Sequence, residues 1–157
     1  MVEKIIINNL IAIAIHASIS IVLWFPTAFM WRWGVWNHRI KSYSLIENWI
    51  LICIFTMATL FLYFWFGRKY LRSTNKLLDN IFSVAAVPVI ISIVAFIGWS
   101  YYNDFSIGMF VLGILISPIH PASETISFYF DMRQSSSYIL MSLLPSVAMC
   151  LGMVVKR

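Results

Sequence analysis

Long uncharged, apolar stretches separate short charged clusters along this chain. The uncharged stretches occupy residues 5–31, 48–67, 80–103, 105–123 and 134–155. A helix needs about 20 predominantly apolar residues to cross the hydrocarbon core of a bilayer. Apolar runs such as 11–23 and 84–97 do not alternate with polar positions, as the strands of a membrane β-barrel would. The pattern therefore predicts an all-α, polytopic transmembrane helical bundle.

We predict a single integral membrane domain over 1–157, and the weakest of its spans is the fourth. The spans are expected at about 5–30, 46–66, 80–102, 105–128 and 136–155. Pro118 and Pro121 interrupt the fourth, and proline removes a helical hydrogen bond. Two architectures stay open: five spans, or four spans plus a re-entrant or broken fourth segment whose backbone is covered by protein. Length favours five, whereas four spans would place Lys156 and Arg157 on the side of the 68–76 cluster, which fits the positive-inside rule better.

The composition agrees with a membrane protein and limits its functions. Hydrophobic residues make up 61% of the 157 residues and charged residues only 11%, whereas soluble domains carry about 25% charged residues. The connections at 32–41 and 68–79 are too short for a catalytic domain, so any chemistry takes place in or at the membrane. Cys53 and Cys150 lie inside predicted spans without CxxC spacing, and we interpret them as packing residues.

Basic residues gather beside the predicted spans. They are Arg32, Arg39 and Lys41 in the first connection, and Arg68, Lys69, Arg72 and Lys76 in the second. The net charge is +5. Because the charges adjoin the bilayer, the expected partner is anionic lipid phosphate and not nucleic acid. The cluster at 68–79 also predicts that this connection and the N-terminus face the cytoplasm, in a plasma (cytoplasmic) membrane.

Polar residues within the first predicted span share one helical stripe. Asn9, His16 and Ser20 lie on the same face as Ala12, because these positions step by three or four. One interpretation is a helix–helix contact with interhelical hydrogen bonds. The other is that His16, near mid-span, acts as a proton relay or as a metal or haem ligand.

The sharper candidate site lies in the fourth segment. Ser117, His120, Glu124 and Ser127 follow a helical stripe, with His120 and Glu124 four residues apart. Such a pair can share a proton, orient the imidazole or bind a metal. Pro121 disturbs an ideal helix here, and the HExxH zinc motif is incomplete. The alternative is an interfacial turn with a solvated carboxylate.

Aromatic residues recur where predicted spans end, for example Tyr63 and Trp65. Amphipathic rings favour the headgroup level, so we interpret them as an interfacial belt.

The sequence as a whole favours a small non-enzymatic membrane protein. We predict a transporter subunit or an accessory protein within a membrane complex, without a cofactor, whose partner is another membrane protein or a second copy of the chain. Stand-alone transporters usually contain internal repeats, and none is visible in this sequence. The alternative is a membrane-embedded enzyme, or a metal- or haem-binding protein, that uses His16, His120 and Glu124.

Overall fold

Helices make up nearly all of the part of the chain that the computed structural model describes, which is residues 2–32, 45–74, 76–100, 113–130 and 132–156. Within these ranges, four helices are long and apolar enough to cross a membrane. They cover Val2–Phe29, Ile50–Tyr70, Leu77–Val94 and Ser136–Val155. The prediction of an all-α membrane bundle is therefore confirmed.

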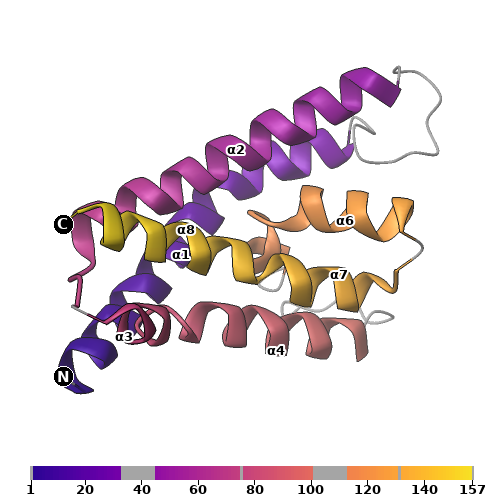
Figure 1. Cartoon of the computed structure of the whole chain (residues 1–157). Coiled ribbons are helices and arrows are strands. Elements are labelled where there is room, and N and C mark those ends of the chain that lie inside the picture. Colours follow the sequence, from indigo (N-terminus) through magenta and orange to yellow (C-terminus); the bar gives the residue numbers. More distant parts are fainter. Residues whose placement is uncertain (1, 33–44, 75, 101–112, 131, 157) are drawn as a thin grey trace.

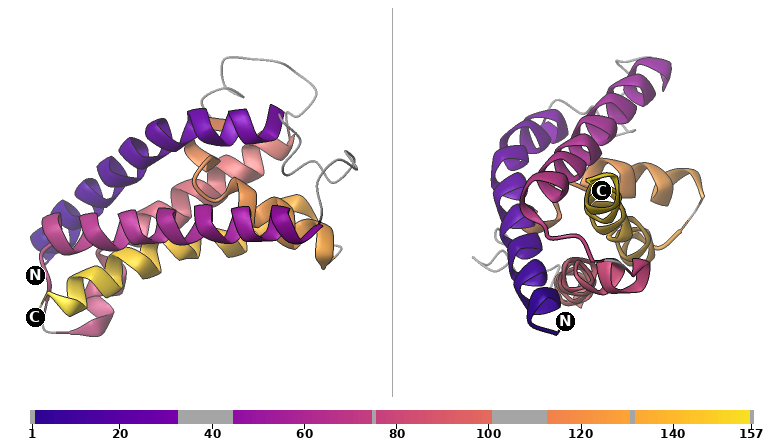
Figure 2. Two further views of the ribbon diagram at one scale, coloured as in Figure 1. Left: turned by 90° about the horizontal axis from the view of Figure 1, so that it is seen from above. Right: turned by 60° about the vertical axis from the view of Figure 1, so that its left-hand side comes forward.

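The crossing elements run alternately up and down the bundle. The first two are α1 (Val2–Arg32) and α2 (Leu45–Tyr70). The third is formed by α3 (Leu77–Phe82) and α4 (Ala86–Ser100), and the fourth by α7 (Gln134–Met141) and α8 (Leu143–Val155). Both ends of the chain consequently lie at the same end of the bundle (Figures 1 and 2). We call this the terminal end and the opposite one the distal end.

The segment predicted as the fourth span is not a continuous helix. Residues 105–112 lie outside the described residues, 113–116 are helical, 117–119 form a turn, and α6 (His120–Tyr129) follows. At 1.5 Å per residue, α6 is about 15 Å long, which is about half of the hydrocarbon core. The end of α4 and the start of α7 lie on the same distal side (Figure 1). Within the described residues, four elements are long and apolar enough to span, and the predicted fourth segment is interrupted at 117–119. We call 113–130 the broken segment.

Prolines determine where the helices break. Pro118 has no N–H, so the Ile114 carbonyl has no ordinary helical partner and instead accepts the Ser117 N–H at 3.1 Å, in a tighter turn. Pro88 likewise leaves the Val84 carbonyl without its helical partner. This carbonyl accepts the Val87 N–H at 3.4 Å, in a tighter turn, and the Ser146 hydroxyl of α8 at 2.9 Å, which ties the third crossing element to the fourth.

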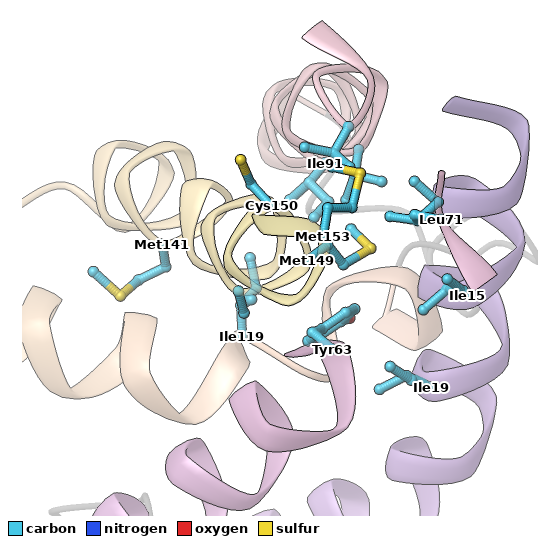
Figure 3. Close-up of a cluster of buried hydrophobic side chains, with 14 of the residues drawn as sticks. Ile15, Ile19, Tyr63, Leu71, Ile91, Ile119, Met141, Met149, Cys150 and Met153 are labelled. Atoms are coloured by element: carbon cyan, nitrogen blue, oxygen red, sulfur yellow. The ribbon is translucent and has the colours of Figure 1, made fainter. Parts of the chain in front are cut away.

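The core is centred on α8. Met149 and Met153 are fully buried there among side chains from the neighbouring helices (Figure 3). Glycine lets α2 and α8 come into backbone contact. A Cβ added at Gly67 would lie 2.7 Å from the Met149 backbone, and one added at Gly152 would lie 2.7 Å from the Arg68 nitrogen. The two helices therefore run side by side in the same direction (Figure 1) and end together at the terminal end.

Candidate functional site

Side chains of α1 bind the backbone of the broken segment. The Nε2 of His16 lies 3.0 Å from the Leu115 carbonyl, and the Ser20 hydroxyl donates to the same oxygen at 3.4 Å. This carbonyl has no helical partner, because the Ile119 N–H bonds to the Ile116 carbonyl at 3.0 Å. The polar face of α1 thus satisfies an acceptor that the helix break exposes inside the bundle.

A second set of contacts involves Ser117. Its hydroxyl donates to the Ser20 carbonyl at 2.9 Å. Its own carbonyl, which Pro121 leaves without a helical N–H, accepts the Thr27 hydroxyl at 3.4 Å. Irregular backbone at membrane depth is tolerated where protein covers it and satisfies its polar groups. These α1 side chains meet that requirement at the turn.

His16 is held from two sides. A carbonyl can only accept a hydrogen bond, so Nε2 carries a proton, and in the neutral ring Nδ1 accepts the Tyr63 hydroxyl at 2.7 Å. The two rings stack with centroids 6.0 Å apart. The expectation that Tyr63 belongs to an interfacial belt is wrong, because its side chain is fully buried beside His16.

The remaining stripe residue, Asn9, acts at the terminal end. Its amide donates to the Phe82 carbonyl at 2.8 Å and accepts the Ala86 N–H at 2.9 Å, which joins α3 to α4. The neighbouring Asn8 makes a similar pair of bonds, at 2.9 and 3.1 Å, with the backbone of Arg72. The predicted stripe therefore has two separate contacts, one with the broken segment and one with the connections after α2 and α3.

His120 and Glu124 lie one turn apart on α6, as their spacing predicts. His120 Nδ1 and Glu124 Oε1 are 3.9 Å apart, and the side chains are 20% and 30% exposed. The hydrogen bond of the imidazole goes to the hydroxyl of Tyr138 on α7, with the two rings nearly parallel at an interplanar angle of 7°. The histidine is thus anchored to a neighbouring element, and Glu124 lies beside it.

Serine hydroxyls also hold α6 in place through hydrogen bonds. The hydroxyls of Ser123 and Ser137 are 2.7 Å apart and join α6 to α7. Ser127 donates to the Met132 carbonyl at 2.8 Å and closes the connection between these helices. Ser117, the first member of the predicted stripe, lies in the turn and contacts α1 instead.

The basic residues of the second connection are all exposed at the terminal end. They are Arg68, Lys69, Arg72 and Lys76. Arg39 and Lys41 lie outside the described residues, and so does the side chain of Arg32.

Several residues that build the site are absent from the sequence-based candidates. Tyr63 and Tyr138 orient the two histidines, and Thr27 and Asn8 extend the contacts of α1. Thr27 could have been found, because it lies seven residues after Ser20 and so shares its helical face. The tyrosines carry no such local signal.

Among the residues that the structure describes, no group of three or more His, Cys, Asp or Glu side chains could hold a metal ion. Comparison with protein-family models, curated proteins and solved structures finds no match. The function therefore has to be inferred from the geometry of the chain's own residues.

Proposed function

We propose that this chain is a non-enzymatic subunit of a membrane transport complex, in which the broken segment binds and transfers a proton. The observation that supports this proposal is the helix break itself. It starts α6 inside the bundle and puts His120 and Glu124 on this half-length helix. Transporters place their ion and substrate sites at such discontinuous helices, and ionisable residues at membrane depth are functional candidates.

The arrangement around His120 suits proton transfer. Imidazole gains and loses a proton near neutral pH. The Tyr138 hydroxyl at Nδ1 fixes the orientation of the ring, in the way that a second hydrogen bond orients working histidines. Glu124 lies one turn nearer the distal end and is partly exposed. The two groups offer successive proton-binding positions between the distal surface and the bundle interior.

A haem or metal role for His16 has less support. Both of its ring nitrogens take part in hydrogen bonds, with Tyr63 and Leu115. A metal ligand needs one imidazole nitrogen free of a proton and directed at the metal, so His16 would have to give up one of these bonds.

The complex is proposed to contain a second copy of this chain or another membrane protein, in a plasma (cytoplasmic) membrane. The terminal end, with the exposed cations Arg68, Lys69 and Arg72, is assigned to the cytoplasm. The distal end, where α6 finishes, then faces outward, and Glu124 is the carboxylate of the pair nearer to it.

The test is proton flux into liposomes that contain the complex as isolated from native membranes in mild detergent. A potassium gradient with valinomycin sets the potential, and an enclosed pH-sensitive dye reports proton entry. We expect Glu124→Gln to lower the flux at least tenfold, because it keeps the shape and removes the proton-binding group. His120→Gln should have a similar effect, and the double variant should be no worse than either single one if the two act as a unit.

Glu3→Gln is the matched control. It removes the same charge from an exposed carboxylate at the terminal end of α1, so it should leave the flux unchanged. Equal flux in the Glu124→Gln, Glu3→Gln and wild-type complexes would contradict the proposal. Absence of flux from an intact wild-type complex would also contradict it and would favour an accessory role.

A further inference from the structure

The terminal end brings together basic residues from separate parts of the chain. The C-terminal end of α2 supplies Arg68 and Lys69, and the close packing of α2 against α8 at Gly152 places Lys156 beside them. The Lys156 ammonium lies 3.4 Å from the Lys69 carbonyl. Lys156 thus caps the end of α2 beside Arg68 and Lys69, and the Lys69 ammonium itself lies over the Tyr70 ring, 5.2 Å from its centroid.

Two further elements add cations at this end. Asn8 binds the backbone of Arg72 and so holds the start of α1, with Lys4, against the connection after α2. Lys76 follows and directly precedes α3. The resulting basic surface is made of Lys4, Arg68, Lys69, Arg72, Lys76 and Lys156, whose side chains are all exposed.

These cations are not neutralised within the described part of the chain. None of them forms an ion pair with a carboxylate there. The carboxylates nearest to them in sequence are Glu3 and Asp79, at the starts of α1 and α3. The basic surface therefore carries a clear excess of positive charge.

An apolar shelf adjoins the basic surface. Immediately after Lys76, the short helix α3 has three apolar residues, Leu77, Leu78 and Phe82, that are each more than half exposed. In the views of Figures 1 and 2, α3 lies at the terminal end, next to the ends of α1 and α8. A cationic surface directly bordered by exposed apolar side chains complements a molecule with an anionic head and an acyl tail.

The geometry points to a docking surface for anionic phospholipid at the terminal end, with the phosphate among Arg68, Lys69 and Lys156 and the acyl chains against α3. Charge complementarity selects an anionic over a zwitterionic headgroup. The apolar shelf selects a lipid over free phosphate. This surface is separate from His120 and Glu124, so its test is independent of the proposed transport function.

The experiment measures lipid retention by native mass spectrometry. The purified full chain is equilibrated in detergent micelles with equal amounts of phosphatidylglycerol and phosphatidylcholine. The wild type should retain mainly phosphatidylglycerol. The triple change Arg68→Gln, Lys69→Gln and Lys156→Gln should lower the ratio of the two retained lipids about fivefold for each charge removed, since each basic residue contributes about 1 kcal/mol. Because the measurement is made in detergent, the orientation of the variant in a membrane does not affect the result.

Two matched variants make the result specific. Arg133→Gln removes one charge from an exposed cation that precedes α7, outside the basic surface. It should change the ratio less than twofold, whereas Lys69→Gln alone should lower the ratio about fivefold. The charge-preserving set Arg68→Lys, Lys69→Arg and Lys156→Arg should keep the wild-type ratio. An equal loss in Arg133→Gln and Lys69→Gln would mean that only net charge matters. An unchanged ratio in the triple variant would mean that Arg68, Lys69 and Lys156 do not hold the lipid. Either result overturns the proposal. Complete displacement of phosphatidylglycerol by excess inorganic phosphate would also overturn it, because the apolar shelf would then contribute nothing.

Discussion

Replacement of Gly152 by alanine tests the closest helix contact in the bundle. The added Cβ would lie 2.7 Å from the Arg68 nitrogen and would also clash with the Phe64 carbonyl oxygen. The first distance is well short of the 3.4 Å at which ordinary contact begins. Both obstacles are backbone atoms of α2, so no side-chain rotation relieves them. The substitution therefore forces α8 away from α2.

The expected cost follows from two opposing contributions. Overpacking a closely packed site costs about 1–3 kcal/mol, and a clash with rigid backbone belongs at the upper end of this range. Replacing glycine by alanine within a helix returns about 1 kcal/mol through helix propensity. The net loss in the free energy of unfolding should be about 2 kcal/mol. For a chain of this size, that corresponds to a melting temperature lower by about 4–8 °C.

Thermal unfolding in detergent, followed by tryptophan fluorescence, measures this loss. Gly113→Ala is the matched control, because an added Cβ at this helical position meets none of the described residues within 4 Å. It should leave the melting temperature unchanged or raise it slightly. If the Gly152→Ala and Gly113→Ala variants melt at the same temperature, the backbone contact between α2 and α8 is not as close as described, and the reasoning fails.

Two further predictions concern buried polar contacts. Ser146→Ala removes the shorter of the two hydrogen bonds that the Val84 carbonyl accepts and should cost about 1 kcal/mol. In a Pro88→Ala background, the restored N–H of residue 88 can donate to the Val84 carbonyl. A double-mutant cycle should therefore give a smaller cost for Ser146→Ala in that background than in the wild type. Equal costs would contradict the hydrogen bond between Ser146 and Val84. Asn8→Ala removes both bonds to the Arg72 backbone and should lower the melting temperature by several degrees; an unchanged value would show that this contact does not hold α1 in place.

The fold class could be predicted because it depends on a property that every residue of a span shares. A helix in lipid satisfies its own backbone and needs only apolar side chains around it, so long uncharged stretches identify it without knowledge of its neighbours. The break in the fourth segment was also readable in part, since Pro118 and Pro121 cannot complete a helix. The position of this break against the middle of α1 could not be predicted, because it depends on contacts between residues about 100 positions apart in the chain.

The candidate site illustrates the same limit. The spacing of His120 and Glu124 places them on one helical face whatever surrounds them. The partner of the imidazole, Tyr138, lies on another helix, and no local pattern relates the two positions. The acceptors at Leu115 and Ser117 are backbone carbonyls, which every residue has, so the sequence cannot indicate which side chain of α1 will bind them.

The long separation between α1 and the broken segment has a consequence for biosynthesis. His16 and Leu115 are 99 residues apart in the chain. Proteins are synthesised at about 5–20 residues per second, so α1 emerges roughly 5–20 s before its hydrogen-bonding partners exist. Throughout that interval its imidazole and hydroxyls would face lipid without these acceptors, at a cost that membrane interiors impose on unpaired polar groups. We therefore expect α1 to stay beside the insertion machinery until the broken segment has been made, and to enter the lipid together with it.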